Sequence, residues 1–389
     1  MTTPSLDNTQ LLHRLIAFDT TSHNSNLDLV DFVSNYVDRP GVTVERNPSP
    51  DGQKANLVIT VGRERATERR DGLILSGHMD VVPAEEPEWE TNPFELTTED
   101  QRYLARGACD MKGFLALAIN EALRLDPAAV SQPLVLILTY DEEVGTLGAK
   151  HFVETWPAAE TLPRSAVIGE PTSLQVLRAH KGHLKFDLEI LGRSAHSGLP
   201  HLGDNAIERA GRALAALSKL REELEAEGDA HADIFPEVPY PALNVALISG
   251  GSAINIIPDR CRLQIGMRTL PGVTGDHLEP RVREALATAL PEDRYQLERT
   301  GESPPMICSH HAHISQALTE DLGEPPGDGA SFATDAGWFQ NLETECVLYG
   351  PGDIGVAHKP NEFLPISEFV QCADVITRLV QQFCMADAT

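Results

Sequence analysis

Lysine, arginine and cysteine are scarce in this sequence, and it has no long apolar run. Across 389 residues, lysine and arginine number 31 against 58 aspartates and glutamates, so the formal net charge is −27. Binding to nucleic-acid phosphates or to anionic membranes depends on a surplus of lysine and arginine. We therefore expect neither nucleic acid nor a membrane as a partner. The surplus of carboxylates favours divalent cations instead.

The six cysteines show no CxxC or other paired spacing, which is typical of free thiols in a reducing compartment. The first residues, MTTPSLDNTQLLHRLIAF, lack the basic start and apolar run of a secretory signal. No apolar stretch approaches the roughly 20 residues that a membrane span needs. These absences predict a cytoplasmic protein. Hydrophobic residues make up 41% of the chain, which predicts a sizeable folded core.

Short apolar runs bounded by turn residues predict an α/β fold. Runs of this kind suit strands that are buried on both faces, and they are residues 56–62, 73–77, 134–140 and 166–170. Apolar residues at helical spacing occupy 9–38, with a polar break at 20–26, and 112–125. Alternation of buried strands with helices indicates a layered α/β architecture.

The pattern changes after Gly182 and predicts a second domain. Strand and helix patterns then follow in the order β-α-β-β-α-β of a ferredoxin-like unit, at residues 185–192, 206–225, 243–251, 262–268, 278–290 and 295–301. Buried strand and helix patterns of the first kind resume at 345–349 and 366–384. We therefore predict one α/β domain built from residues 1–182 and 301–389, interrupted by an inserted α+β domain of residues 183–300.

Polar side chains with metal-binding or proton-transfer chemistry stand mostly at the ends of the predicted buried strands. These residues are His78, Asp80, Asp110, Glu142, Glu143, Glu170 and His358. In an open α/β sheet the carboxyl ends of the strands share one rim, where ligands bind. Residues far apart in the sequence are therefore expected to converge there.

Two histidines with several carboxylates and no cysteine are what a two-metal hydrolytic site requires. Imidazole and carboxylate suit zinc, cobalt or manganese. Two such ions share a bridging carboxylate and activate a water, whose proton needs a base such as one of the paired glutamates. Taken singly, each motif has a plainer explanation, because a lone DEE usually starts a solvated helix. Their joint placement at strand ends favours the metal site.

The motifs together resemble the M20 family of metallopeptidases and deacylases along nearly the whole chain. They are GHMDVVP, RGACDMKGF, DEEVGTLGA, IGEPTSLQVLRAHKGH, GRSAHSGLP and GPGDIGVAHKPNEF. The resemblance implies a zinc-peptidase-like α/β catalytic domain with an inserted ferredoxin-like dimerisation or lid domain. It also implies a homodimer and two divalent metal ions, with Zn²⁺ favoured and Co²⁺ as the alternative.

The resemblance assigns a role to each residue of the expected centre. Asp110 would bridge the two metals, His78 and Glu170 would complete the first metal site, and Glu143 and His358 would complete the second. A glutamate at position 170 resembles the deacylases, whereas an aspartate there is common among aminopeptidases of the family.

Two further roles concern proton transfer and orientation. Glu142 would be the general base and then the acid, so two adjacent glutamates would have different tasks. Asp80 would accept a hydrogen bond from the far nitrogen of His78 and fix its tautomer.

Three residues of the inserted domain also match family positions. His196 would reach the active site of the neighbouring subunit and donate a hydrogen bond to the tetrahedral oxyanion. Asn255 and Arg268 resemble substrate-binding positions, and a guanidinium suits bidentate capture of an α-carboxylate. The plainer readings are a turn histidine and a surface salt bridge.

The motifs look most similar to the branch of the family that removes acetate from N2-acetyl-L-ornithine in arginine biosynthesis. The expected substrate is thus a small N-acyl amino acid. The nearest alternatives are desuccinylation of N-succinyl-diaminopimelate, another N-acyl amino acid deacylase and a dipeptidase. A non-catalytic metal-binding dimer is the alternative outside enzymes, although it would have no need of a base and an oxyanion donor.

Overall fold

The computed structural model describes residues 6–62, 71–157, 161–228 and 231–385. The chain forms two compact units: unit 1 comprises Met1–Arg178, Cys308–Gly327 and Thr334–Thr389, and unit 2 comprises Ala179–Ile307 and Asp328–Ala333. The boundaries expected from the sequence, 183 and 300, differ from these by a few residues. The expected boundaries also assign Asp328–Ala333 to the α/β domain, whereas the structure groups this segment with unit 2. No pattern in the sequence of the segment indicates that it belongs to unit 2.

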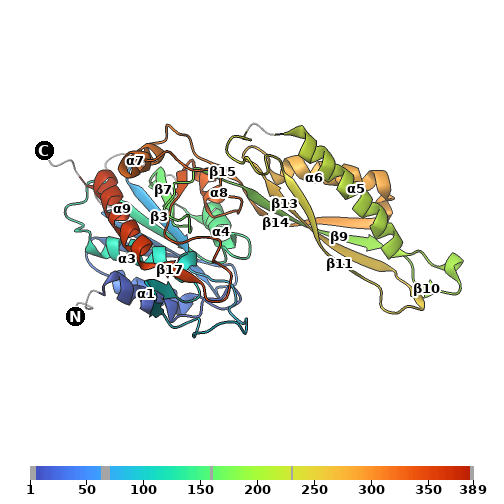
Figure 1. Ribbon diagram of the computed structural model, residues 1–389, viewed down its shortest axis with the longest axis horizontal. Helices are drawn as coiled ribbons and strands as arrows, with labels where there is room; N and C mark the ends of the chain where they lie inside the picture. Colours follow the sequence, from blue (N-terminus) through green and yellow to red (C-terminus); the bar gives the residue numbers. More distant parts are fainter. Residues whose placement is uncertain (1–5, 63–70, 158–160, 229–230, 386–389) are drawn as a thin grey trace. The chain divides into compact units, whose positions relative to one another are not determined.

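A six-stranded mixed sheet forms the centre of unit 1 (Figure 1). In spatial order its strands are β1 (Val42–Pro48), β2 (Ala55–Val61), β6 (Leu134–Thr139), β3 (Leu73–His78), β7 (Ser165–Ile168) and β16 (Glu345–Leu348). The last four are parallel to one another, and β1 and β2 pair antiparallel with their neighbours. Every residue of β2, β3, β6 and β7 is buried, as expected for strands covered on both faces.

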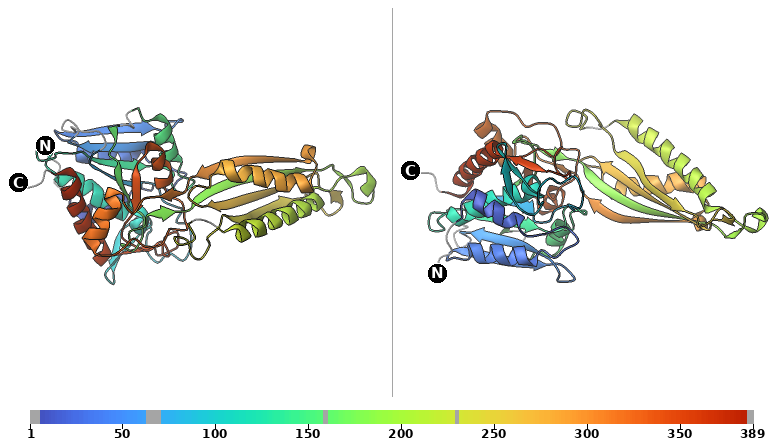
Figure 2. Two further views of the ribbon diagram at one scale, coloured as in Figure 1. Left: turned by 90° about the horizontal axis from the view of Figure 1, so that it is seen from above. Right: turned by 60° about the horizontal axis from the view of Figure 1, so that its bottom comes forward.

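Helices cover this sheet (Figure 2). Those of unit 1 are α1 (Asn8–Ile16), α2 (Leu27–Val37), α3 (Gly113–Arg124), α4 (Leu147–Thr155), α7 (His313–Leu322), α8 (Ala336–Phe339) and α9 (Ile366–Cys384). The most buried is α3, which packs against α1, α2, α9 and the strands β3 and β6. α4 packs against β2 and α8. A small sheet of β4 (Thr97–Glu99), β5 (Arg102–Leu104) and β17 (Phe363–Pro365) completes the unit.

Unit 2 is built on a four-stranded antiparallel sheet with the order β11-β13-β9-β14. Its strands are β9 (Gly182–Leu191), β11 (Ala242–Gly250), β13 (Arg260–Thr269) and β14 (Tyr295–Ser303), and its helices are α5 (Ala206–Glu227) and α6 (Gly275–Ala289). Residues of β9 alternate between buried and partly exposed, since α5 and α6 cover only one face. This arrangement confirms a ferredoxin-like α+β unit in addition to the α/β unit.

Short strand pairs complete unit 2. β8 (Ala179–His180) pairs with β15 (Met306–Ile307), which brings the two ends of the inserted segment together. β10 (Ala195–His196) pairs with β12 (Ile256–Ile257). Among the described helices of both units, none combines the length and apolar character that a bilayer crossing requires.

Candidate metal centre

The parallel strands of unit 1 bring the candidate residues to one edge of the sheet. β3 ends at His78, whose register partner in β6 is Thr139. Glu142 and Glu143 follow β6 by a few residues, and Glu170 follows β7. Because these strands run in the same direction, their following residues meet at the same rim.

Two groups of possible metal ligands share one carboxylate at this rim. His78, Asp110 and Glu170 form the first group and Asp110, Glu143 and His358 the second, with ligand atoms within 4.8 Å of one another in each. Asp110 Oδ1 lies 3.1 Å from His78 Nε2, and Asp110 Oδ2 lies 3.4 Å from His358 Nε2. The two oxygens of Asp110 thus face different histidines, which is the disposition of a bridging carboxylate.

Burial raises the pKa of all three glutamates at the centre. Desolvation is the largest cause in each case, and it raises the pKa of Glu143 to about 7 and those of Glu142 and Glu170 well above their usual range. The nearby charge of Asp110 adds to the effect at Glu143 and Glu170. Several carboxylates gathered out of water repel one another, so the site as a whole favours a cation.

The histidines respond in the opposite sense. Hydrogen bonds to Asp110 and Glu143 raise the pKa of His358 to about 10. The pKa of His78 also lies above its usual value, because hydrogen bonding and attraction to Asp110 outweigh its burial. Burial also disfavours the charged form of Asp110, yet hydrogen bonds from the two histidines lower its pKa. Each histidine therefore favours its protonated form beside these carboxylates, and this proton supplies the positive charge that a bound metal ion would otherwise supply.

The donor set fits a pair of divalent metal ions. Glu143 Oε1 and Glu170 Oε1 are buried and have no hydrogen-bond partner, although a buried carboxylate oxygen normally has one. A metal ion at each group would satisfy these oxygens and offset the clustered negative charge. Imidazole nitrogen with carboxylate oxygen is a donor set suited to Zn²⁺.

Asp80 is placed differently from the expectation. His78 Nδ1 lies 2.9 Å from the main-chain oxygen of Asp80 and 3.7 Å from its Oδ1, too far for a hydrogen bond. The main-chain oxygen is therefore the acceptor that selects the tautomer of His78. The expectation that the carboxylate plays this part is corrected, because that carboxylate is engaged elsewhere.

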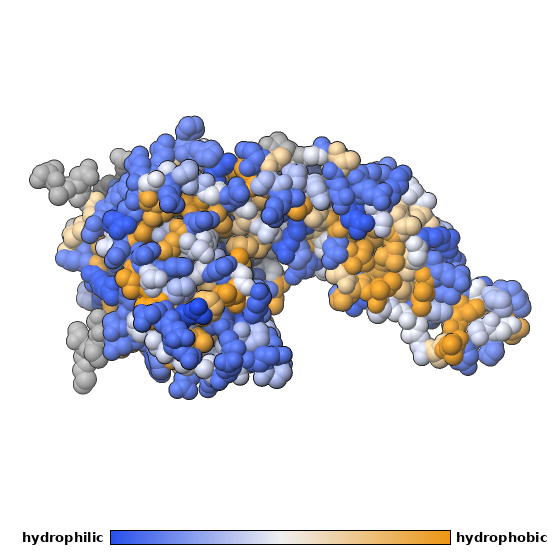
Figure 3. Space-filling model, in the orientation of Figure 1, coloured by the Kyte–Doolittle hydropathy of each residue, from blue (hydrophilic) through white to orange (hydrophobic). Residues whose placement is uncertain are grey.

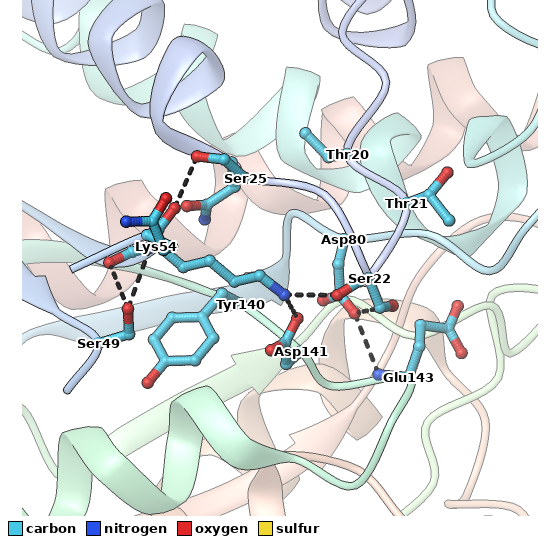
Figure 4. Close-up of polar contacts among 12 residues, drawn as sticks. Thr20, Thr21, Ser22, Ser25, Ser49, Lys54, Asp80, Tyr140, Asp141 and Glu143 are labelled. Atoms are coloured by element: carbon cyan, nitrogen blue, oxygen red, sulfur yellow. Dashed lines mark hydrogen bonds and ion pairs between the residues drawn. The ribbon is translucent and has the colours of Figure 1, made fainter. Parts of the chain in front are cut away.

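The carboxylate of Asp80 holds the start of the segment that carries the paired glutamates. Its Oδ1 accepts from the main-chain N–H of Glu142 at 3.1 Å, and its Oδ2 accepts from that of Glu143 at 3.3 Å and from the Ser22 hydroxyl at 2.7 Å (Figure 4). Two consecutive N–H groups bound to one carboxylate fix the backbone at this turn. Glu143 is thereby held for His358, while Glu142 remains outside both ligand groups.

An ion pair that the sequence reasoning did not identify supports the same turn. Lys54 Nζ contacts the carboxylate of Asp141 and donates to the main-chain oxygen of Ser22 at 2.5 Å (Figure 4). Asp141 directly precedes Glu142 and has a left-handed backbone, with φ of 54°. Lys54 thus joins the segment before Glu142 to Ser22, whose hydroxyl binds Asp80.

A close approach of helix to backbone sets the position of Glu170. A Cβ added at Gly169 would lie 2.0 Å from the ring of Phe114 on α3. Only glycine leaves room for that ring beside the chain, so α3 packs directly against the residue before Glu170.

The three candidate residues of unit 2 lie on or beside its strands. His196 is exposed at the end of β10, and its Nδ1 accepts a hydrogen bond from Gly198 N at 3.0 Å. In the neutral ring this places the proton on Nε2, which is then a donor. Asn255 is exposed just before β12, and its main-chain oxygen accepts from Ser197 N. Arg268 lies in β13, opposite His183 of β9.

Arg268 belongs to the face of the sheet that α5 and α6 leave uncovered. Its neighbour Met267 is in the core of unit 2, so the alternation of the strand directs Arg268 to the other face. His183, which pairs with it, has a pKa lowered to about 4 by burial and by the positive charge of Arg268 and Lys185. A cationic group of this kind suits an anionic ligand.

Two buried carboxylates near the centre also escaped the sequence reasoning. Asp335 accepts from the Thr139 hydroxyl at 2.5 Å, and its other oxygen is buried without a partner. Burial raises its pKa to about 6. Glu362 lies four positions beyond His358 in a motif that the family resemblance included, but no chemical feature of the sequence distinguishes it. Neither residue belongs to the two ligand groups.

The family model for peptidase family M20/M25/M40 matches residues 74–382 of the chain. That range contains both ligand groups and Glu142, and it covers most of the chain. The protein therefore belongs to this family of hydrolases.

Relatives of nearly full length share the family. An acetylornithine deacetylase of Myxococcus xanthus is 37% identical over 384 residues, covering 96% of each chain. A protein of the same name from Pasteurella multocida is 36% identical over 385 residues, covering 96% of this chain and 97% of its own.

Solved structures agree with the fold. An M20 family metallo-carboxypeptidase from Sulfolobus solfataricus matches with a TM-score of 0.77 at 17% identity, covering 97% of this chain and 99% of its own. An aminopeptidase PepT from Bacillus cereus matches with a TM-score of 0.72 at 19% identity, with the same coverage. At these identities the likeness concerns the fold alone, and it confirms the M20-type α/β architecture with a separate antiparallel sheet.

Proposed function

We propose that the protein hydrolyses N2-acetyl-L-ornithine to L-ornithine and acetate, a step of arginine biosynthesis in the cytoplasm. The observation that carries the proposal is the pair of ligand groups that share Asp110, with Glu142 beside them and outside both. Full-length relatives named acetylornithine deacetylase support the choice of substrate.

Two divalent metal ions, Zn²⁺ or alternatively Co²⁺, would be held by the two groups described above. His78 and Glu170 would hold one ion, Glu143 and His358 the other, and Asp110 would bridge them. Bound there, such ions supply polarisation of the amide carbonyl and activation of a water molecule.

Glu142 is the proton carrier of the proposed reaction. Burial raises the pKa of Glu142, and its carboxylate would take a proton from the attacking water and keep it until the C–N bond breaks. The proton then passes to the α-amine of ornithine, which leaves, while the acetyl carbon keeps the oxygen of the water. The turn held by Asp80 keeps Glu142 in place without engaging its side chain in metal binding.

Three residues of unit 2 also enter the proposal. His196, whose Nε2 is a donor, would stabilise the negative oxygen that develops on the acetyl carbon, and it would do so from a second copy of the chain. Arg268 would bind the α-carboxylate of the substrate, with Asn255 as a further polar contact. An arginine offers two parallel donors to a carboxylate.

We also propose that the protein is a homodimer joined through unit 2. β11 is an edge strand of its sheet, and the side chains of Leu247 and Ile248 on it are 61% and 54% exposed. Ile254, shortly after β11, is completely exposed. Figure 3 shows hydrophobic residues gathered over the sheet of this unit. An exposed apolar edge strand is a site for pairing with another chain, and a second copy supplies the matching surface.

Two substrates distinguish the proposal from its nearest alternative. With Zn²⁺ or Co²⁺ added, kcat/KM for N2-acetyl-L-ornithine should exceed that for N-succinyl-diaminopimelate by at least about 100-fold, since a charged group without its partner is strongly disfavoured in a specific site. A reversed preference would identify a desuccinylase instead. Stoichiometric metal without turnover of any acyl amino acid would favour a non-catalytic role.

Replacement of Glu142 tests the chemistry. Glu142→Gln should lower kcat by about 10³-fold or more, because the amide cannot accept the proton of the water. Metal content, measured by atomic emission, should stay near that of the wild type. Loss of metal together with activity would make Glu142 a ligand and contradict its role as the proton carrier.

A further inference from the structure

Glu362 is a buried carboxylate whose hydrogen bonds all go to the segment that carries Asp110. Its side chain is 1% exposed. Oε1 accepts from the main-chain N–H of Cys109 at 2.8 Å and of Asp110 at 3.0 Å, and Oε2 accepts from that of Gly107 at 3.1 Å. Three N–H groups within four consecutive residues are therefore bound to one side chain, which defines the path of the backbone just before the shared ligand.

Arg106 supplies the fourth donor to the same carboxylate. Its Nη1 lies 2.7 Å from Glu362 Oε2, and both side chains are 1% exposed. The guanidinium is itself tied down, since Nη2 donates to the main-chain oxygen of Pro83 at 3.2 Å and its carbon lies 5.2 Å from the ring centre of Trp89. Although Arg106 Nε has no hydrogen-bond partner, both terminal nitrogens of the guanidinium are bound, so the Glu362 carboxylate is held by a buried ion pair.

Glu362 also belongs to the segment that carries His358, another candidate ligand of the second group. It follows His358 by four residues and directly precedes β17, which pairs with β5 through Phe363 and Leu104. The main-chain oxygen of Glu362 accepts from Ala105 N at 3.2 Å. Both the side chain and the main chain of Glu362 thus form hydrogen bonds that join the segment of His358 to the segment of Asp110. These two segments are far apart in the sequence.

We propose that Glu362 is a positioning residue that sets the spacing between Asp110 and His358, so that the two metal ions are bound as a pair. The inference rests on the proposed metal centre and adds to it a residue that touches neither metal nor substrate. Loss of a residue that orients a metal ligand usually weakens metal binding about 10–100-fold.

The amide of glutamine cannot reproduce this arrangement. Both oxygens of Glu362 accept two hydrogen bonds each, from four N–H donors. In Glu362→Gln an NH₂ group would replace one acceptor and face two of those donors, whichever way the amide is turned. The variant therefore changes the hydrogen bonding at nearly constant volume.

A matched control is available on the neighbouring helix. Glu368, in the first turn of α9, accepts from Gly352 N at 2.8 Å, a hydrogen bond outside the Asp110 segment. Glu368→Gln therefore also alters a side-chain hydrogen bond to a main-chain N–H near His358, but it leaves the spacing of the ligands alone.

The test measures Zn²⁺ binding by the full-length protein in competition with a chromophoric chelator, well below the unfolding temperature of each variant. We expect two zinc ions in the wild type and in Glu368→Gln, and binding at least about 10-fold weaker in Glu362→Gln. Equal zinc affinity in folded Glu362→Gln and the wild type would overturn the inference, even if the variant unfolds at a lower temperature. A wild type that binds no zinc would instead refute the metal centre itself.

Arg106→Lys provides a second variant if Glu362→Gln does not fold. Lysine keeps the positive charge but not the fixed fork of donors, so the carboxylate keeps its three N–H contacts and loses its firm anchor. Zinc binding should weaken by about 3–10-fold, with kcat at saturating zinc lowered and KM little changed. Zinc affinity and kcat both equal to those of the wild type would contradict the positioning role.

Discussion

His180 is a buried histidine in unit 2 whose ring is held by a single main-chain contact. Its Nδ1 lies 2.9 Å from the main-chain oxygen of Lys181, and its Nε2 is buried without a hydrogen-bond partner. Burial lowers its pKa from 6.5 to about 4. The folded chain therefore holds this ring neutral at a pH where the unfolded chain takes up a proton.

The pH dependence of stability follows from that shift. A lowered pKa contributes stability that is present above pH 6.5 and is lost as the pH falls towards 4. Between about pH 7 and about pH 5 the contribution of His180 should fall by about 2 kcal/mol. Urea unfolding at both pH values checks it, since His180→Gln should lose less stability than the wild type over this interval. The same loss in both proteins would show that other groups cause it.

The candidate ligands could be selected from the sequence mainly because several of them follow buried apolar runs. His78, Glu143 and Glu170 stand where parallel strands end, and the fold brings such positions together. Glu362 and Lys54 were missed for a physical reason. They bind main-chain groups or a carboxylate next to the ligands, and a side chain that serves the backbone leaves no pattern in the sequence. The carboxylate of Asp80 was misassigned for the same reason.

At the scale of elements, α5 shows how a single cap contributes to the stability of unit 2. Asn205 precedes the helix, and its side-chain oxygen accepts from the N–H groups of Ile207 at 3.0 Å and Glu208 at 3.3 Å. Asn205→Ala should lower the free energy of unfolding by about 1 kcal/mol, because two N–H groups lose their acceptor. Asn205→Asp, which keeps an acceptor at that position, should remain close to the wild type in the same urea experiment. Equal losses in both variants would contradict the capping role.

Elements with strong patterns were predicted, and elements that depend on their neighbours were not. β2 and β6 are mostly apolar and buried along their whole length, and the two helices predicted within residues 9–38 are present as α1 and α2. β1 was missed because it lies at the edge of the sheet, and most of its residues are only partly buried. A partly exposed edge strand such as β1 buries fewer side chains than a central strand. Its sequence therefore lacks the continuous run of apolar residues by which the central strands were predicted.

For the whole molecule, the proposed dimer makes a direct prediction. Leu247→Asp should convert a protein with the mass of two chains into one with the mass of a single chain, because a charge on an apolar edge strand opposes pairing. Val370→Asp is the control, since Val370 is 53% exposed on α9 of unit 1. Light scattering at matched concentrations measures both. A wild type with the mass of one chain would refute the dimer.

Unit 1 is assembled from chain on both sides of unit 2, and this order has a consequence for synthesis on the ribosome. His78, Asp110 and Glu170 emerge first, but β16 and His358 follow only after the whole of unit 2 has been made. At about 5–20 residues per second the delay amounts to roughly ten seconds or more. During that time the nascent chain exposes β7 without β16, its parallel neighbour in the finished sheet. Unit 2 has both ends joined by β8 and β15 and needs little later sequence. It is therefore the part able to fold before His358 completes the second group of candidate ligands.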